Sequence, residues 1–185
     1  MQALLIVVFS MLACMVYGVI HDQITARICV EYFTIGHAPV FDTEDPTLLG
    51  LGWGVRATWW VGLLVGVPLA TFARIGGRPQ RSAVSLVRPM LVLMGCTAVL
   101  AAAMGVVALV GATSGWIALD PDMAARLPPE EHTPFIVDLW IHNTSYTSGF
   151  VGGVFVMGWV WWTRIKLEQA GRRAKKVRDD IEALR

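Results

Sequence analysis

Ionisable side chains stand within or directly beside apolar segments of this 185-residue chain, where a charge is costly and marks a candidate site. The candidate members of a polar cluster are His21, Asp22, Arg27, Glu31, His37, Arg56, Asp138 and His142. Histidines and carboxylates together suit zinc, copper or non-haem iron, and they also suit proton relay because histidine titrates near neutral pH. The metal ligands suggested by residue type are His21, Glu31, His37 and His142. The chain has no HExxH, CxxC or Glu-x-x-His motif, so no cofactor is predicted and a bound transition metal stays an alternative.

Two of these residues carry opposite charges in the same half of the predicted membrane domain. Arg56 lies about two turns, and Asp138 about one turn, from the outer ends of their segments. We expect them to pair, directly or through His142, Asn143 or His21, because a charge at membrane depth finds a partner. One interpretation is a buried ion-pair network that fixes helix register. The other is a functional site near the outer face.

The composition places these residues in a membrane protein. Hydrophobic residues make up 55% of the chain and charged residues only 16%, whereas a soluble domain is about a quarter charged. Segments of roughly 20 apolar residues can cross a membrane as helices. The predicted spans cover about residues 3–20, 49–73, 86–112 and 135–163. We therefore predict an all-α polytopic protein, with an antiparallel four-transmembrane-helix bundle over residues 1–163 and a basic helical tail over 164–185.

The charges between the predicted spans indicate the orientation. The connection between the second and third spans is basic, as is the tail, whereas the other two connections are mainly acidic. Basic loops face the cytoplasm, so we expect a multi-pass inner (plasma) membrane protein with both termini cytoplasmic. The formal net charge is only +1, and nothing in the charge pattern predicts a nucleic-acid partner.

Glycine pairs at four-residue spacing mark the expected contacts between helices. These pairs are Gly50 and Gly54, Gly62 and Gly66, and Gly149 and Gly153. Small residues let helix backbones approach closely in lipid, so we expect the pairs at the seams of the bundle.

The segment after the first span is too polar for a buried helix and too regular for a slack loop. We expect residues 21–35 to extend the first helix or to form a separate amphipathic helix at the outer surface.

The same segment, HDQITARICVEYFTIGHAPVF at residues 21–41, resembles the signature of a family of small four-span bacterial integral membrane proteins. That signature is an HDQ-T-R-x-C-EYFT-x-x-H block after the first span. The matching residues are His21, Asp22, Gln23, Thr25, Arg27, Glu31, Tyr32, Phe33, Thr34 and His37. The resemblance continues more loosely through residues 46–66 and covers about a third of the chain. It implies a four-helix membrane bundle and directs attention to these positions, but it implies no activity.

The tail carries an apolar stripe at heptad-like spacing, from Leu167 to Leu184. Three interpretations stay open for residues 167–184: a solvated helix, a coiled coil with a second copy or a partner subunit, or a basic face on anionic lipid.

For function, the sequence favours a non-enzymatic structural or accessory subunit in the lipid bilayer, with a buried polar cluster near its outer face. The alternatives are a small transporter or channel subunit that uses this cluster, and a metal-dependent membrane enzyme.

Overall fold

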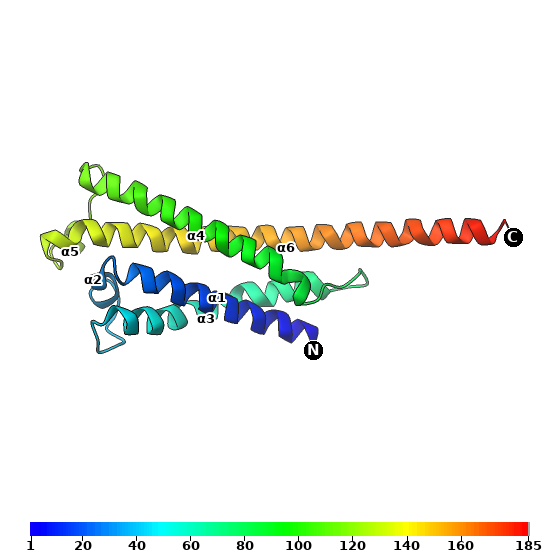
Figure 1. The fold of residues 1–185 in the computed structure, drawn as a ribbon, viewed down its shortest axis with the longest axis horizontal. Helices are drawn as coiled ribbons and strands as arrows, with labels where there is room; N and C mark the ends of the chain where they lie inside the picture. Colours follow the sequence, from blue (N-terminus) through cyan, green and yellow to red (C-terminus); the bar gives the residue numbers. More distant parts are fainter. Residues whose placement is uncertain (185) are drawn as a thin grey trace.

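The computed structural model describes residues 1–184, and the regular structure of these residues is entirely helical (Figure 1). The elements are α1 (Gln2–Thr25), α2 (Val30–Thr34), α3 (Pro46–Arg74), α4 (Val84–Thr113), α5 (Pro121–Ala124), the 3-10 helix η1 (Pro129–Glu131) and α6 (His132–Glu182). Helices α1, α3 and α4 are each long and apolar enough to cross a membrane.

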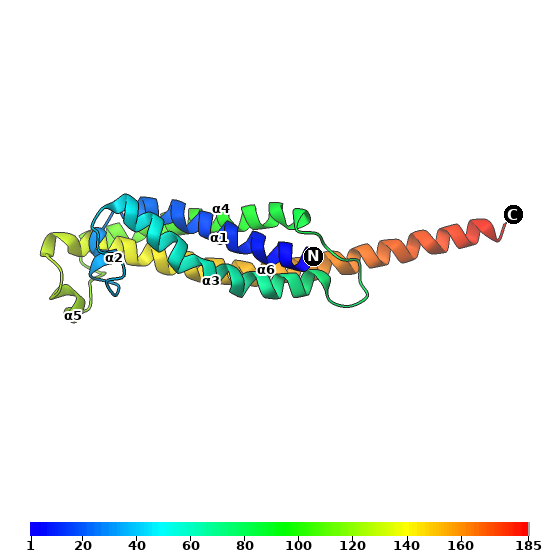
Figure 2. The same ribbon diagram turned by 90° about the horizontal axis from the view of Figure 1, so that it is seen from below.

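The four long helices lie side by side (Figures 1 and 2). Helix α1 packs along α3, and α4 packs along α6, while the two pairs meet mainly through α3 and α6. At one end, the α2 end, lie α2, α5 and η1. At the other, the tail end, lie the N-terminus and the loop between α3 and α4, and α6 continues past them.

Local sequence explains where α3 and α5 begin. The Asp45 carboxylate accepts hydrogen bonds from the backbone N–H groups of Thr47 and Leu48, both at 2.9 Å. Asp120 caps α5 in the same way, and a proline occupies the first turn of each helix. Aspartate at the cap and proline in the first turn are the residue types that favour a helix start.

Glycines bring α1 and α3 into backbone contact. A Cβ added to Gly54 would lie 2.5 Å from the Cα of Val19, and one added to Gly62 would collide with the backbone of Met11. The predicted seam is therefore confirmed for α3, where only a hydrogen fits between the two helices. It is wrong for Gly149, because a Cβ there would meet no other atom within 4 Å.

Apolar side chains close the bundle interior at both ends and also cover its outside. At the tail end, Ile6, Leu69, Leu86 and Val160 pack together, one from each long helix. At the α2 end, a second apolar cluster joins the α1–α2 turn, α2, α3, the α5–η1 region and α6. The outer face of α1 exposes further large apolar residues, including Ile20 at 59%. Such faces are stable where the surrounding medium is itself apolar.

The structure resolves an alternative that the sequence left open for residues 21–35. Helix α1 runs on to Thr25, and after a turn the separate short helix α2 follows, so residues 21–35 both extend the first helix and form a second one. The connection from 114 to 131 is a structured cap that contains α5 and η1.

Candidate functional site

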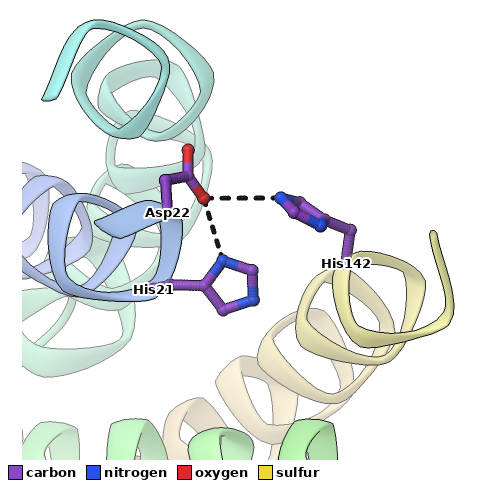
Figure 3. Close-up of side chains that lie close together, drawn as sticks. All are labelled: His21, Asp22 and His142. Carbon is purple, nitrogen blue, oxygen red and sulfur yellow. Dashed lines mark hydrogen bonds and ion pairs between the residues drawn. The ribbon is translucent and has the colours of Figure 1, made fainter. Parts of the chain in front are cut away.

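Two histidines and an aspartate meet where α1 and α6 face each other near the α2 end (Figure 3). His21 and Asp22 come from the last turns of α1, and His142 comes from α6. Asp22 Oδ1 lies 2.9 Å from His21 Nδ1 and 3.4 Å from His142 Nε2. The three side chains are 6–10% exposed, so the contacts are almost completely shielded from the surroundings. We call these three residues the His–Asp cluster.

The outward-facing nitrogen of each histidine also has a partner. His142 Nδ1 lies 3.0 Å from both the backbone carbonyl oxygen and the Oδ1 atom of Asp138, four residues earlier on α6. His21 Nε2 lies 3.0 Å from Ser145 Oγ, which in turn lies 3.1 Å from the Tyr17 hydroxyl. Polar contacts therefore run without a break from Tyr17 through the His–Asp cluster to Asp138.

Asp138 is fully buried, and neither of its carboxylate oxygens accepts a hydrogen bond from residues 1–184. The single N–H that His142 Nδ1 can carry points to the Asp138 carbonyl, so its interaction with the carboxylate is mainly electrostatic. A buried carboxylate is stable only if it is neutralised, which makes the charge on or beside His142 decisive for this site.

Helix α2 supplies an aromatic wall for the cluster. The Tyr32 ring stacks on the His142 ring with centroids 4.3 Å apart, and Phe33 meets the same imidazole edge-on at 5.6 Å. Burial raises the pKa of the Tyr32 phenol, so this ring stays neutral at physiological pH. The wall excludes water from one side of His142 and holds its imidazole in place.

The His–Asp cluster forms the polar end of a cavity. The cavity has a volume of about 390 Å³ and lies between α1, α3, α4 and α6. Away from the cluster, its lining is dominated by apolar side chains, among them Val61, Leu64, Met90, Leu93, Met94 and Phe150. Gly149 leaves part of the α6 wall without a side chain.

The structure brings four of the eight predicted candidates together and places the other four elsewhere. His21, Asp22, Asp138 and His142 share the network described above. Arg27 instead donates hydrogen bonds to Gln23 and to Thr47 Oγ1, which ties the end of α1 to the start of α3.

The remaining three candidates, Glu31, His37 and Arg56, lie outside the His–Asp cluster and have different neighbours. Glu31 lies near Cys29 and Glu131, where these three residues form a second group of metal-ligand types. His37 Nδ1 contacts the backbone carbonyl of Tyr32 at 2.8 Å. Neither Glu31 nor His37 joins His21 and His142 in one group, as the ligand set expected from residue type required.

The predicted ion pair between Arg56 and Asp138 does not form. Arg56 is exposed on α3, and its guanidinium lies 6.0 Å from the centroid of the Trp53 ring. Asp138 points into the interior and pairs with His142. The physical reason is orientation: the Arg56 side chain lies on the exposed face of α3, whereas Asp138 lies on the face of α6 that is buried in the bundle.

The candidate cluster predicted from the sequence lacks three residues that complete the site, namely Tyr17, Tyr32 and Ser145. Tyr17 and Ser145 stand four residues before His21 and three after His142, so helical spacing carried a signal for both. Tyr32 belongs to the block after the first span, but no spacing along the chain indicates that its ring stacks on His142 of α6.

Comparison with protein-family models, with curated proteins and with solved structures finds nothing that matches this chain.

Proposed function

We propose that this chain is a four-span protein of the bacterial inner membrane that binds a lipid-soluble molecule with a polar head group. The fourth span would be the first half of α6. This segment lies beside the three apolar helices and turns Phe150, Val154 and Phe155 outward, the last at 74% exposure. The resemblance of residues 21–41 to a family of four-span membrane proteins supports the same architecture.

The observation that carries the proposed activity is the cavity that ends on the His–Asp cluster. Its volume of about 390 Å³ is in the range of sites that enclose small organic ligands. Such sites combine an apolar lining with a few polar groups that orient the ligand. Here the apolar part would hold the body of the ligand, while His21, Asp22, His142 and the Tyr17–Ser145 pair would bind its head group.

The rim of the cavity indicates how the ligand would enter. Trp60, Leu64 and Phe150 line the cavity and are also 48–61% exposed, so they lie where the interior meets the outside of the bundle. In a membrane, this rim faces acyl chains. A ligand dissolved in the bilayer would reach the cavity laterally. The mostly apolar lining favours such a ligand over a hydrated ion, and a hydrated ion is what a channel or transporter subunit would need to bind.

The proposal is tested by filling the cavity without disturbing the helix contacts. Leucine at Gly149 has room for its Cβ and projects into the cavity, whereas Gly158→Leu is a matched control on the same helix, also with open space, that does not line it. We expect organic extracts of the purified wild-type protein and of Gly158→Leu to contain one lipid-soluble compound in near-stoichiometric amount by mass spectrometry. Gly149→Leu should lose at least nine-tenths of it. The proposal fails if no such compound is found, or if all three proteins carry it equally.

A second proposed role, as an accessory subunit, rests on the far half of α6. Beyond residue 164 this helix extends past the other helices (Figure 1), and its apolar residues Leu167, Val177 and Ile181 are 44–58% exposed. We propose that residues 167–184 bind a second copy or a partner subunit through this stripe. Removal of residues 167–185 should then reduce the detergent-solubilised assembly to a monomer, and an unchanged size would exclude this role.

A further inference from the structure

We propose that His21, Asp22 and His142 bind one divalent transition-metal ion of borderline softness, with Zn²⁺ as the representative. This ligand set of two imidazoles and one carboxylate differs from the set that residue types alone suggested, since Asp22 takes the place of Glu31 and His37. The inference does not depend on the lipid-soluble ligand proposed above.

The spacing of the three donor atoms fits such an ion. Zinc binds histidine nitrogen and carboxylate oxygen at about 2.0–2.1 Å, so in tetrahedral geometry two neighbouring donor atoms lie about 3.3 Å apart. Asp22 Oδ1 lies 2.9 Å from His21 Nδ1 and 3.4 Å from His142 Nε2. The three residues form a group whose donor atoms all lie within 4.8 Å of one another. Small side-chain rotations would bring all three donors to one ion.

The partners of the outward-facing nitrogens are compatible with the form of histidine that a metal needs. A metal-bound histidine uses one unprotonated nitrogen and donates the N–H of the other to a nearby acceptor. The backbone carbonyl of Asp138 provides that acceptor for His142 Nδ1 at 3.0 Å, and the Asp138 carboxylate lies at the same distance without accepting a hydrogen bond. Ser145 Oγ provides it for His21 Nε2 at 3.0 Å. When both histidines donate to these acceptors, the nitrogen that is free to bind a metal is in each case the one that faces Asp22.

The charge of the site points to the same conclusion. Asp22 and Asp138 place two carboxylates in an almost completely buried site, and the Asp138 carboxylate oxygens accept no hydrogen bond within residues 1–184. His142 has an acceptor next to both of its nitrogens, so a neutral imidazole would leave one nitrogen lone pair facing an oxygen lone pair. A divalent ion between Asp22 and His142 removes this repulsion and supplies two positive charges for two carboxylates.

The site is of the open kind that binds a further ligand. Three protein donors leave a tetrahedral ion with one free position, as in catalytic rather than structural zinc sites. All three donor residues line the cavity, so the free position faces it. The head group of a molecule in the cavity, or a water, would occupy that position.

Metal titration of the folded, full-length protein tests the inference. The detergent-purified chain is freed of metal with EDTA and titrated with Zn²⁺, and separately with Co²⁺, whose visible absorption reports coordination number. We expect one ion per chain with a dissociation constant at or below the micromolar range, and an intense tetrahedral Co²⁺ spectrum. If the wild-type protein binds neither ion, this result alone overturns the inference. A proton on His142 would then supply the positive charge in place of the ion.

Variants then assign the ligands. Asp22→Asn and His142→Gln keep the size of the side chains, and each should weaken binding at least 100-fold. Asp138→Asn, which alters only the partner of His142, should weaken it 10- to 100-fold. His37→Gln is the matched control, because His37 contacts the same Tyr32 but lies outside the cluster, and it should bind as wild type does. Equal binding by wild type and His142→Gln would place the ion elsewhere and overturn the assignment.

The outcome separates this inference from the proposed lipid-soluble ligand. Gly149→Leu should keep the metal while losing the extractable compound. A metal-free protein that still carries the compound would refute only the metal site, and a metal-loaded protein without the compound would refute only the cavity ligand.

Discussion

His142 is the residue on which most of the buried polar contacts converge. Its imidazole lies between Asp22 and Asp138, which come from different helices, and it is covered by Tyr32. A buried charge that loses its partner is strongly destabilising, whereas an exposed one is not. The effect of a substitution on stability therefore depends on how buried the side chain is rather than on its residue type. Arg56 is exposed and His142 is buried, so we expect opposite results for the two.

For the pair His142 and Asp138, we expect strong energetic coupling. His142→Ala should lower the free energy of unfolding by about 3–5 kcal/mol, because it strands two buried carboxylates. The double variant with Asp138→Ala should cost less than the sum of the single variants by about 1–3 kcal/mol. Arg56→Ala, the exposed control, should change stability by less than about 0.5 kcal/mol. Unfolding in mixed detergent micelles compares the four variants with the wild type, and strict additivity would show that the two residues are not partners.

Cys29 offers a pH-dependent prediction outside the long helices. Burial, with Glu31 and Asp138 nearby, raises the pKa of its thiol to about 12. Because only the thiolate reacts, alkylation of native Cys29 at pH 8 should be slower than in the unfolded chain, on the order of a thousandfold. In a Cys14→Ala, Cys96→Ala background, the native iodoacetamide rate should still rise tenfold per pH unit at pH 10. After unfolding in SDS, it should level off above about pH 9. A native plateau near pH 9 would contradict the shifted pKa.

At the scale of elements, a single side chain joins α6 to the end of α3. Arg164 is fully buried and donates hydrogen bonds to the carbonyl oxygens of Phe72, Ile75 and Pro79 at 2.5–2.9 Å, and to that of Arg78 at 3.2 Å. Carbonyls at the end of a helix lack partners within the helix and carry partial negative charge, so a guanidinium satisfies both needs. Because α3 and α6 belong to different helix pairs, this contact helps to set how the two pairs meet at the tail end.

Replacement of Arg164 should therefore loosen the tail end. Arg164→Met keeps the length of the side chain but removes all four hydrogen bonds, and we expect a loss of about 3 kcal/mol in unfolding free energy. Arg172→Met removes an ion pair to Glu168 in which the arginine is 79% exposed, and it should cost less than about 0.5 kcal/mol. Equal effects of the two variants in thermal unfolding would argue against the anchoring role of Arg164.

At the scale of the whole molecule, the basic and the acidic segments between the helices lie at opposite ends. The basic loop between α3 and α4 lies at the tail end with both termini, while the acidic segments lie at the α2 end with α2 and α5. The His–Asp cluster lies toward the acidic end, which would be the outer side if basic segments stay in the cytoplasm.

Topology reporters test this orientation together with the fourth span. A fluorescent protein fused to either terminus should be active in the cytoplasm, and alkaline phosphatase should be active when inserted after Asp120. Insertion at Gly77, in the open loop between α3 and α4, is the matched cytoplasmic control. Termini on opposite sides of the membrane would mean that α6 does not cross it.

Much of the architecture could be predicted because it depends on composition along the chain. Segments of 18 or more apolar residues must become helices in lipid, and the helices observed contain the predicted spans and extend them by a few residues, or by a long continuation in α6. The i,i+4 spacing of Asp138 and His142 likewise predicts that both side chains lie on one face of a helix, which is where they are found.

The partners across the bundle are what the sequence by itself could not determine. Membrane depth follows from position along a helix, but contact depends on how each helix is rotated about its axis, and packing between helices sets that rotation. Arg56 and Asp138 carry opposite charges yet never meet, because Arg56 is exposed and Asp138 is buried. Asp22 meets His142 because glycines draw α1 against α3 while α6 faces it from the other pair. Sequence alone thus determined which segments are helical and which residues could do chemistry. Only the tertiary structure decided that His21, Asp22 and His142 meet and that a cavity lies beside them.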